Sequence, residues 1–575
     1  MANPKIIFGI KFNLLFLLLF SFPSLQAQSP YNYSFNKLES NLMAAVVCAH
    51  PLASEVGANI LLQGGNAFDA AIATQLALAV VYPRAGNLGG GGFMLAHLKD
   101  NISFAIDFRE TAPGAAFSNV YVDTLTGKAD TNLSLHGPSS AGVPGTVAGI
   151  FKMMPYAKLS FDSLIAPAIR LAKYGFCISA LEARKLNDHQ EVFKKDNKEA
   201  ILFVKKEGWK EGDTLRQDDL AKTLIRIKED GQDGFYKGET AKLILEEMKR
   251  GGGFISAFDL ANYTVRMRDP MKFKYRDYNL VMMPLPSSGG MINQQVLTML
   301  QILEKKYGKA KTPIAFYQRF IEAERRAFSD RSFYLGDPDY TDAPVDSLLS
   351  MNYLRSRIAD FDPDRASISA DIQPGIFESD ETTHLNILDA EGNAISITTT
   401  LNGNYGSKTL VKGAGFFLNN EMDDFSIQPG VPNQFGAIGA AANAIGPNKR
   451  MLSSMSPLIV LKNDKVFALM GAPGGTTIPT SVNLTFLRLV DLNFTPQEAV
   501  AAPRLHHQWL PDVLYLENGF SKQEADELQL MGHNTKFRGA FGSIELIVLD
   551  KNGSYTAVGD PRGDDSVKGI SREKD

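Results

Sequence analysis

The first part of the chain alternates short apolar runs with longer stretches of helical spacing. Residues 42–48 form a continuous apolar run of strand length, whereas residues 51–62 and 67–81 space their apolar side chains as a helix does. Two more segments of strand length follow at residues 93–98 and 102–108. This order predicts helices that pack against a sheet.

The middle of the chain, from about residue 160 to residue 357, has mainly helical spacing. Charged faces such as those of residues 243–250 and 316–328 are typical of solvated helix surfaces. A stretch of proline, serine and glycine at residues 284–290 predicts a loop before a further helix at residues 292–304.

From Thr382 onward the pattern changes to strands joined by polar turns. Three segments predict hairpins, at residues 385–401, 458–470 and 544–558. Helical stretches interleaved with such hairpins predict stacked antiparallel sheets covered by helices, which is a layered α/β body.

Glycines gather at residues 86–92, where four are consecutive. Glycine permits a tight turn or a close approach of two backbones. No Gly-Lys-Ser/Thr sequence follows the cluster, so a phosphate-binding loop is disfavoured. We expect the cluster to serve packing.

The composition is that of a globular chain, with 44% hydrophobic and 21% charged residues among 575. The formal net charge of -4, and the absence of a basic stretch with interleaved aromatic residues, argue against a nucleic-acid partner.

The start of the chain has the pattern of an export signal. Lys5 and Lys11 precede the apolar run 14–20, and Ala27 offers a small residue at a cleavage point. The run is far shorter than the ~20 residues that span a bilayer, so we expect no stable membrane span once residues 1–27 are removed. The mature protein is expected to be periplasmic or secreted.

Cys48 and Cys177 are the only cysteines. They lie far apart in apolar surroundings, so a disulfide framework is excluded, and two buried thiols are a better interpretation than one bridge. A zinc site would need more ligands than His506 and His507 supply. We expect no metal and no cofactor.

The sequence Glu381-Thr382-Thr383-His384 opens the first hairpin. A threonine hydroxyl is a poor nucleophile unless a neighbouring group accepts its proton, and a free α-amine on the same residue can do so. Cleavage between Glu381 and Thr382 would create that amine. Two adjacent threonines alone would instead be interpreted as β-branched strand residues.

Several segments together resemble the γ-glutamyltransferases. They are Gly-Gly-Asn-Ala at residues 64–67, Ala-Gly-Asn-Leu-Gly-Gly-Gly-Gly-Phe-Met at 85–94, Asp-Phe-Arg-Glu-Thr-Ala-Pro at 107–113, Glu-Thr-Thr-His at 381–384, Thr-Leu-Asn at 400–402, Leu-Asn-Asn-Glu-Met-Asp-Asp-Phe-Ser at 418–426, Leu-Ser-Ser-Met-Ser-Pro at 452–457 and Gly-Ala-Pro-Gly-Gly at 471–475. The resemblance covers essentially the whole mature chain.

This resemblance implies an N-terminal-nucleophile hydrolase with an αββα fold, two stacked antiparallel sheets covered by helices. Such a precursor would cut itself between Glu381 and Thr382. The large subunit, residues 28–381, and the small subunit, residues 382–575, would form a heterodimer.

The resemblance also assigns the catalytic groups. Thr382 corresponds to the nucleophile, Thr400 to the second threonine that supports it, and Gly474 and Gly475 to the backbone donors of the oxyanion hole. A glycine pair suits that role because two N–H groups must approach the developing charge closely.

A γ-glutamyl group carries an α-carboxylate and an α-ammonium, so its site needs a cation and at least one carboxylate. By the resemblance, the carboxylate side is Arg109 with Ser453 and Ser454, and the ammonium side is Asp424 with Glu421 and Asn402; Arg109 offers bidentate geometry. Without the resemblance, we would interpret Arg109 as part of a surface ion pair with Asp107 or Glu110. We would interpret Asp423-Asp424 as a turn or helix cap.

The implied reaction starts with attack of Thr382 on the γ-carbonyl of glutathione or a related compound, and water or an acceptor amino acid or peptide then takes the acyl group. Two alternatives stay open: a β-lactam or glutaryl acylase on the same scaffold, and an inactive secreted binding protein. Residues 428–450 resemble a lid loop, with Phe435 where a tyrosine is expected; its missing hydroxyl predicts a lid that closes less firmly.

Overall fold

The computed structural model describes residues 30–372, 382–428 and 440–571. Within these ranges the main sheet has 13 strands, of which all but β18 follow the order β6-β3-β2-β10-β9-β1-β17-β16-β12-β11-β8-β7, and β18 lies off this path, paired to β1. The strands are β1 Leu38–Cys48, β2 Gly91–His97, β3 Ser103–Asp107, β6 Arg266–Arg268, β7 Met271–Tyr275, β8 Tyr278–Met282, β9 Thr383–Leu388, β10 Ala394–Thr400, β11 Leu458–Lys462, β12 Lys465–Gly471, β16 Glu545–Leu549, β17 Tyr555–Val558 and β18 Ser566–Ser571.

The path folds back on itself, so that its two halves stack as two antiparallel layers. Strand β12 contacts β9 and β10 of the other half, and β11 contacts β2 and β10. The two layers are continuous through the pairing of β1 with β17. The stacked antiparallel sheets expected from the hairpin pattern are therefore present, joined along one edge.

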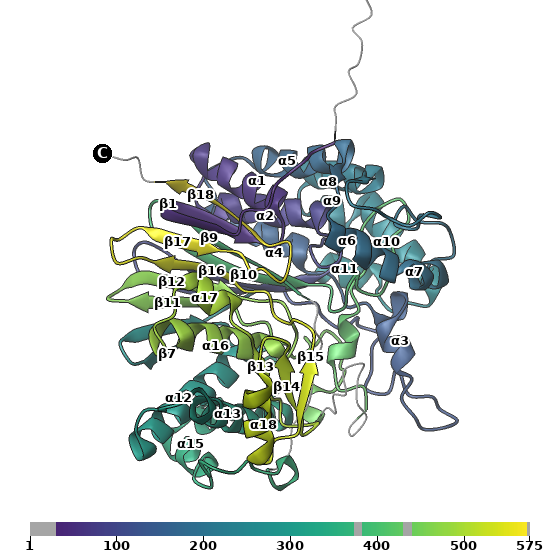
Figure 1. Cartoon of the computed structure of the whole chain (residues 1–575). Helices are drawn as coiled ribbons and strands as arrows, with labels where there is room; N and C mark the ends of the chain where they lie inside the picture. Colours follow the sequence, from purple (N-terminus) through teal and green to yellow (C-terminus); the bar gives the residue numbers. More distant parts are fainter. Residues whose placement is uncertain (1–29, 373–381, 429–439, 572–575) are drawn as a thin grey trace, which may run out of the picture.

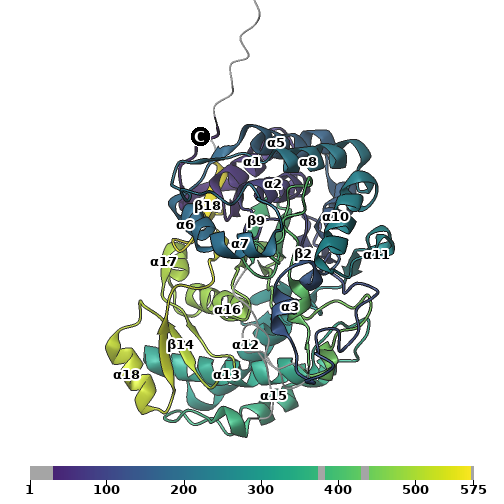
Figure 2. The same ribbon diagram turned by 90° about the vertical axis from the view of Figure 1, so that its right-hand side faces the viewer.

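Helices cover both outer faces of the stacked sheets (Figure 1). The upper layer contains α1 Pro51–Leu62, α2 Ala67–Val81, α4 Thr146–Met153, α5 Phe161–Tyr174 and α8 Asp218–Asp230, and α6 Ala180–Asp188 and α10 Gly238–Gly251 lie beside the sheets, at the right of the figure. The lower layer contains α12 Gly289–Tyr307, α13 Pro313–Tyr334, α15 Met351–Arg357 and α16 Thr477–Val490. The resulting order of layers is αββα. Figure 2 shows the same arrangement from the side, with β14 Leu514–Glu517 and α18 Lys522–Leu530 beside α13.

The side chains of β1 alternate between two hydrophobic cores. Ala44, Val46 and Cys48 belong to the core under the upper helices, whereas Ala45 and Val47 belong to the core shared by the sheets and the lower helices. Successive side chains of a strand point to opposite faces, so a strand covered on both faces is apolar throughout. This explains the uninterrupted apolar run at residues 42–48.

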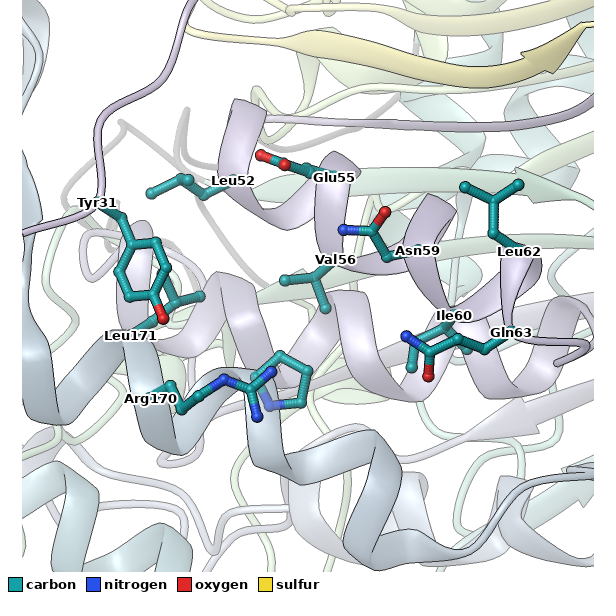
Figure 3. A pocket seen from close by; sticks show the side chains of 11 residues that line it. Tyr31, Leu52, Glu55, Val56, Asn59, Ile60, Leu62, Gln63, Arg170 and Leu171 are labelled. Carbon is teal, nitrogen blue, oxygen red and sulfur yellow. The ribbon is translucent and has the colours of Figure 1, made fainter.

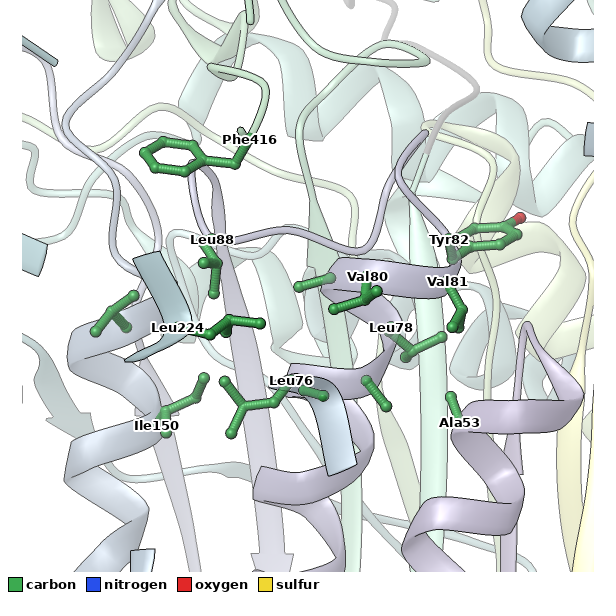
Figure 4. Close-up of a cluster of buried hydrophobic side chains, with 14 of the residues drawn as sticks. Ala53, Leu76, Leu78, Val80, Val81, Tyr82, Leu88, Ile150, Leu224 and Phe416 are labelled. Carbon is green, nitrogen blue, oxygen red and sulfur yellow. The ribbon is translucent and has the colours of Figure 1, made fainter. Parts of the chain in front are cut away.

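Helix α2 lies at the centre of the upper core, where all of its residues are buried (Figure 4). A reciprocal capping box starts it, since the Asn66 side chain accepts from the N–H of Asp69 and the Asp69 side chain accepts from the N–H of Asn66. A helix that is hydrophobic on all sides is expected to be buried. The helix contacts both β9 and β10, so it supports the strands that carry the threonines.

The glycine cluster packs β2 against its neighbours, as expected. A Cβ on Gly92 would lie 2.3 Å from the carbonyl oxygen of Thr398, and one on Gly90 would lie 2.0 Å from that of Thr400. Only glycine allows these approaches without displacing β10.

Three strands and the partial exposure of Cys177 were not predicted. The region from residue 160 to residue 357 is mainly helical, as predicted, but residues 266–282 form β6, β7 and β8. Strands β7 and β8 extend the lower sheet, and β7 alternates exposed with less exposed residues, so it lacks the continuous apolar run of a buried strand. Cys177 is only partly buried, while Cys48 is buried, and both are free thiols.

The predicted signal segment lies outside the described residues, as do Glu381 and Phe435. Among the residues that are described, no helix combines the length and the apolar composition needed to cross a membrane.

Substituting Gly92→Ala is expected to destabilise the fold by about 1–3 kcal/mol, because the new methyl group must push β2 away from β10. The measurement is the apparent unfolding midpoint in denaturant. Gly539→Ala is the matched control, since a Cβ there meets nothing within 4 Å. Equal midpoints for the two variants would contradict the close-packing role.

Candidate functional site

Thr382 immediately precedes β9, and the hairpin pairing brings it opposite the end of β10. Thr383 pairs with Thr399, so the next position along the ladder sets Thr382 against Thr400. Thr382 is 6% exposed and Thr400 is 3% exposed. The predicted approach of the two threonine-bearing strand ends is therefore confirmed, while the hydrogen bond from Thr400 to the Thr382 hydroxyl stays a prediction.

Asn87, in the glycine-rich loop, holds the end of β10 in place. Its Nδ2 donates to the carbonyl oxygen of Thr400 at 2.9 Å, and its Oδ1 accepts from the N–H of Gly90 at 3.0 Å. On the other side, the N–H of Asn402 donates to Thr400 Oγ1 at 2.7 Å. The backbone and the hydroxyl of Thr400 are thus both restrained.

His384 fills the space between the two sheets beneath Thr382. Its Nδ1 lies 2.8 Å from Thr398 Oγ1 and its Nε2 lies 3.1 Å from Asn386 Oδ1. Burial lowers the pKa of His384 to about 3, so the ring is neutral at physiological pH. A Cβ on Gly471 of β12 would lie 2.2 Å from this ring, which shows how closely the sheets approach here.

A small cavity opens at Thr382 and Thr400. It is lined by Arg109, Thr382, Thr400, Asn402, Glu421, Asp424, Ser453, Ser454, Met455, Gly475 and Ile478. The predicted site residues therefore converge, with Gly474 adjacent to the lining and Glu381 outside the described residues. Arg109 comes from the N-terminal part of the chain, whereas the other lining residues come from separate segments between residues 382 and 478.

Arg109 follows β3, and its guanidinium is the cation of the cavity. Nη1 lies 2.6 Å from Glu421 Oε2, and Nη2 lies 2.5 Å from Asp424 Oδ2. The residue is only 1% exposed, so the alternative of a surface ion pair is wrong. A buried guanidinium between carboxylates avoids the cost of an unpaired buried charge.

Glu110 lies against the same guanidinium, with its Oε2 at 3.5 Å from Arg109 Nη1. Burial raises the pKa of Glu110 to about 8, although the positive charge of Arg109 opposes the shift. The Glu110 side chain is therefore mostly neutral at pH 7, which leaves Glu421 and Asp424 as the carboxyl groups that face the guanidinium.

The carboxyl groups of Glu421 and Asp424 project from one turn of 3-10 helix, Glu421–Asp424. The N–H of Glu421 donates to Asn419 Oδ1 at 3.1 Å, and Asn443 Nδ2 donates to the carbonyl oxygen of Asp424 at 2.7 Å. Asn402 adopts a positive φ of 72° and donates from Nδ2 to the carbonyl oxygen of Asn420 at 3.0 Å. These bonds fix the polar groups at one end of the cavity.

Ser453 and Ser454 lie in the buried loop before β11. The loop is clamped to the segment at residues 284–290: the N–H of Ser453 donates to the carbonyl oxygen of Pro286 at 2.8 Å, and the N–H of Ser288 donates to that of Ser453 at 2.7 Å. Ser454 Oγ lies 3.4 Å from Ser288 Oγ. The contact between these two loops therefore holds the hydroxyls of Ser453 and Ser454 in the same cavity as Arg109.

Gly474 and Gly475 connect β12 to α16 at the opposite side of Thr382. Both have positive φ, 128° and 55°, which favours glycine. Their carbonyl groups accept from the N–H groups of Thr477 and Ile478 at 3.0 Å, whereas their own N–H groups donate to no residue in the described ranges. The first turn of α16 adds the positive end of its dipole, so this side of the cavity suits a developing negative charge.

The cavity thus combines the hydroxyl-bearing side chains of Thr382 and Thr400, the backbone of Gly475, and a cation flanked by two carboxyl groups. Sequence reasoning missed the apolar wall of Met455 and Ile478, the restraint by Asn87 and the buried Glu110. The segments that contain Asn87 and Glu110 were recognisable as motifs, but their contacts with β10 and Arg109 were not. Among the described residues, no group of three or more His, Cys, Asp or Glu side chains is arranged to hold a metal ion.

Comparison with known proteins agrees with this geometry. The family model described as gamma-glutamyltranspeptidase matches residues 53–570. The chain is 42% identical over 522 residues to the glutathione hydrolase proenzyme of Escherichia coli strain K12, covering 90% of each chain. It is 43% identical over 525 residues to the glutathione hydrolase proenzyme of Pseudomonas aeruginosa, covering 90% of this chain and 93% of that protein.

Solved structures share the fold. A cephalosporin acylase from Bacillus halodurans superposes with a TM-score of 0.80 at 26% identity, covering 94% of this chain and 98% of that chain. The γ-glutamyltranspeptidase of Helicobacter pylori superposes with a TM-score of 0.53 at 40% identity, covering 60% of this chain and 97% of that chain. The αββα fold of N-terminal-nucleophile hydrolases is thereby confirmed, and the chain belongs to the γ-glutamyltranspeptidase family.

Proposed function

We propose that the protein is a γ-glutamyltransferase and glutathione hydrolase that activates itself by cleavage between Glu381 and Thr382. The observation that carries this proposal is the cavity that runs from Thr382 to Arg109, where the guanidinium is flanked by Glu421 and Asp424. An α-amino acid end group needs one cation and at least one carboxylate, and the cavity offers both.

In this proposal the precursor divides into a large subunit, residues 28–381, and a small subunit, residues 382–575, which remain together as a heterodimer. The exchange of strands between the two parts supports it: β9 and β10 of the second part pair with β1 and β2 of the first. Export through the segment 1–27 would place the mature enzyme in the periplasm or outside the cell.

The reaction follows from the positions of the groups. The α-carboxylate of the γ-glutamyl group binds Arg109 with Ser453 and Ser454, and its ammonium binds Asp424, Glu421 and Asn402. The Thr382 hydroxyl then attacks the γ-carbonyl carbon and passes its proton to the α-amine of the same residue.

The N–H groups of Gly474 and Gly475 stabilise the oxyanion, and Thr400 orients the attacking hydroxyl. Collapse of the tetrahedral intermediate breaks the amide bond, the departing amine takes the proton, and a γ-glutamyl ester remains on Thr382. Water or the amine of an acceptor amino acid or peptide then releases the acyl group.

The structural likeness to a cephalosporin acylase keeps an acylase as the second candidate. The two activities differ in whether the substrate carries an α-ammonium, so γ-glutamyl-p-nitroanilide and glutaryl-p-nitroanilide distinguish them. Faster cleavage of the γ-glutamyl compound supports our proposal, and faster cleavage of the glutaryl compound would replace it with the acylase.

The proposed self-cleavage predicts two polypeptides. Wild-type protein is expected to show two polypeptides of ~39 and ~21 kDa on a denaturing gel, from the mean residue mass of a 62.9 kDa chain of 575 residues. Thr382→Ala is expected to remain one polypeptide and to have no measurable turnover, because both the hydroxyl and the new amine depend on it.

The matched control is Thr383→Ala, which alters the neighbouring threonine on the opposite face of β9 and should be processed. End-group sequencing of the small polypeptide identifies its first residue. A different first residue, or undiminished turnover in Thr382→Ala, contradicts self-cleavage at Glu381.

If Asp424 binds the α-ammonium of the γ-glutamyl group, removing its negative charge should weaken catalysis. Asp424→Asn is expected to lower kcat/KM for γ-glutamyl-p-nitroanilide by about 10- to 100-fold, since a hydrogen bond to a charged group contributes roughly 1.5–3 kcal/mol. Turnover of glutaryl-p-nitroanilide should change much less. Asp423→Asn is the control, because Asp423 accepts from Ser134 Oγ away from the cavity lining. An equal loss for both substrates would indicate a general structural defect.

The ionisation of Glu110 predicts how kcat/KM depends on pH. As pH rises through about 8, Glu110 ionises and its negative charge competes with the substrate carboxylate for Arg109. The kcat/KM of wild type divided by that of Glu110→Gln should therefore fall near pH 8, and this ratio cancels the titration of the substrate. A ratio that is flat between pH 6 and pH 9 contradicts the proposed competition.

A further inference from the structure

A buried network of polar side chains begins at the residue that follows Gly475. Its members, which we call the Glu324 network, are Thr476, Thr480, Glu324, His506 and Gln508. They come from the start of α16, from α13, and from β13 Leu505–His506 with the loop that follows it. Each of the five residues is at most 6% exposed.

The network is continuous from the glycine loop to α13. Thr476 Oγ1 donates to Gln508 Oε1 at 2.8 Å, and the same oxygen contacts His506 Nε2. The other ring nitrogen, His506 Nδ1, lies 2.7 Å from Thr480 Oγ1. Thr480 Oγ1 in turn contacts Oε1 of Glu324. Four successive hydrogen bonds therefore join Thr476 to a carboxyl group on another helix.

Glu324 is a buried carboxyl group that forms no ion pair within the described ranges. Its neighbours in sequence, Arg325 and Arg326, pair with other carboxylates. Its Oε1 contacts the Thr480 hydroxyl, and its Oε2 accepts from the N–H of His507 at 3.3 Å. Burial raises the pKa of Glu324 well above its usual value, so the carboxyl group is protonated at neutral pH.

The contacts determine where the protons of the network lie. Burial lowers the pKa of His506 to about 3, so its ring is neutral and carries one proton. Gln508 Oε1 can only accept, so that proton is on Nε2, and Nδ1 accepts from the Thr480 hydroxyl. The single hydroxyl proton of Thr480 is then used, so the protonated Glu324 must be the donor in its contact with Thr480.

The network restrains one end of the glycine loop. Thr476 is bonded to Gly475, so the hydrogen bond of its side chain holds the loop where α16 begins. The Thr477 hydroxyl holds the other end, because it donates to the carbonyl oxygen of Gly474 at 2.7 Å. Both glycines have positive φ and no side chain of their own, so the direction of their N–H groups depends on these two contacts.

We propose that Glu324, acting through its network, is a positioning residue for the N–H groups of Gly474 and Gly475. Its role is to donate a hydrogen bond, and it neither carries a charge nor touches the substrate. The inference rests on the proposed function, in which these N–H groups stabilise the oxyanion. Such donors accelerate a reaction only when they are already aimed at the developing charge.

The test compares two substitutions of Glu324 that differ in their ability to donate. In Glu324→Gln the amide nitrogen can donate to Thr480 while the amide oxygen accepts from His507, as the protonated carboxyl group does. Glu324→Met has a similar length but no donor. The measurement is p-nitroaniline release from γ-glutamyl-p-nitroanilide in a single turnover, which gives a limiting rate and a half-saturating concentration.

Glu324→Gln is expected to keep the limiting rate of wild type. Glu324→Met should lower that rate by about 10- to 100-fold, less than the roughly 10²–10³-fold loss when an oxyanion donor is removed outright. The half-saturating concentration should stay the same in both variants, because the α-amino acid end binds elsewhere. Rates are expressed per processed molecule, counted from the two polypeptides on a denaturing gel.

A boronic acid separates positioning from general damage. A glutamate analogue with boronic acid in place of the γ-carboxyl group can form a tetrahedral adduct with the Thr382 hydroxyl, whereas L-2-aminobutanoate offers only the α-amino acid end. Glu324→Met should weaken inhibition by the boronic acid by about 10-fold and leave inhibition by L-2-aminobutanoate unchanged. An equal loss for both inhibitors would overturn the proposal.

The control substitutions make the same exchanges outside the network. Thr480→Val and Thr485→Val each remove a buried hydroxyl from α16, but Thr485 Oγ1 has no hydrogen-bond partner among the described residues. Only Thr480→Val should slow p-nitroaniline release. Glu55→Met alters a separate hollow of about 330 Å³ between α1 and α5, which is lined by no member of the network (Figure 3), and should leave the rate unchanged.

The outcomes separate the two proposals. If wild type releases no p-nitroaniline from γ-glutamyl-p-nitroanilide, the proposed function fails. If wild type is active and Glu324→Met releases p-nitroaniline as fast as wild type, the function stands and the positioning role is wrong. A loss in Glu324→Gln as large as that in Glu324→Met also overturns the inference, because donation by Glu324 would then not be what matters.

Discussion

The pairing of β9 with β10 is the constraint on which the site depends. It places Thr382 opposite Thr400 in the middle of a folded sheet, covered by α2 on one face and by β12 on the other. A hydroxyl positioned at the end of a buried strand loses little freedom when a substrate binds, since the ladder already holds its backbone. The neutral ring of His384 hydrogen-bonds to Thr398 and Asn386 in the same layer and lies close to Gly471 of the opposite layer.

The second element of the site is the cluster of buried charged groups around Arg109, in which each charge would destabilise the fold if it were not paired. Arg109 is buried among three carboxyl groups, and burial alone would penalise each charge. The neutral form of Glu110 reduces the number of like charges, so the guanidinium is balanced by Glu421 and Asp424. A zwitterionic end group entering the cavity can exchange partners with this set, one charge for one charge, without leaving any of them unpaired.

Two cavities adjoin Thr382. The first is lined by the paired charges of Arg109, Glu421 and Asp424, and the second is larger and is lined by Arg84, Arg184, Lys185 and Arg562 but by no aspartate or glutamate.

Local pattern sufficed for most of the elements, because apolar periodicity and capping residues act within a few positions of one another. The helices α1 and α2 and the hairpins β9–β10, β11–β12 and β16–β17 are where periodicity places them, whereas β7 lacks a continuous apolar run and was missed. The sequence by itself determined the chemistry available, a threonine that cleavage could activate and the charged residues suited to an amino acid. Only the tertiary structure decided that Arg109 is buried against Glu421 and Asp424 and that this cluster lines the same cavity as Thr382. These contacts join segments far apart in the chain, and their geometry depends on how whole layers pack, which no local pattern encodes.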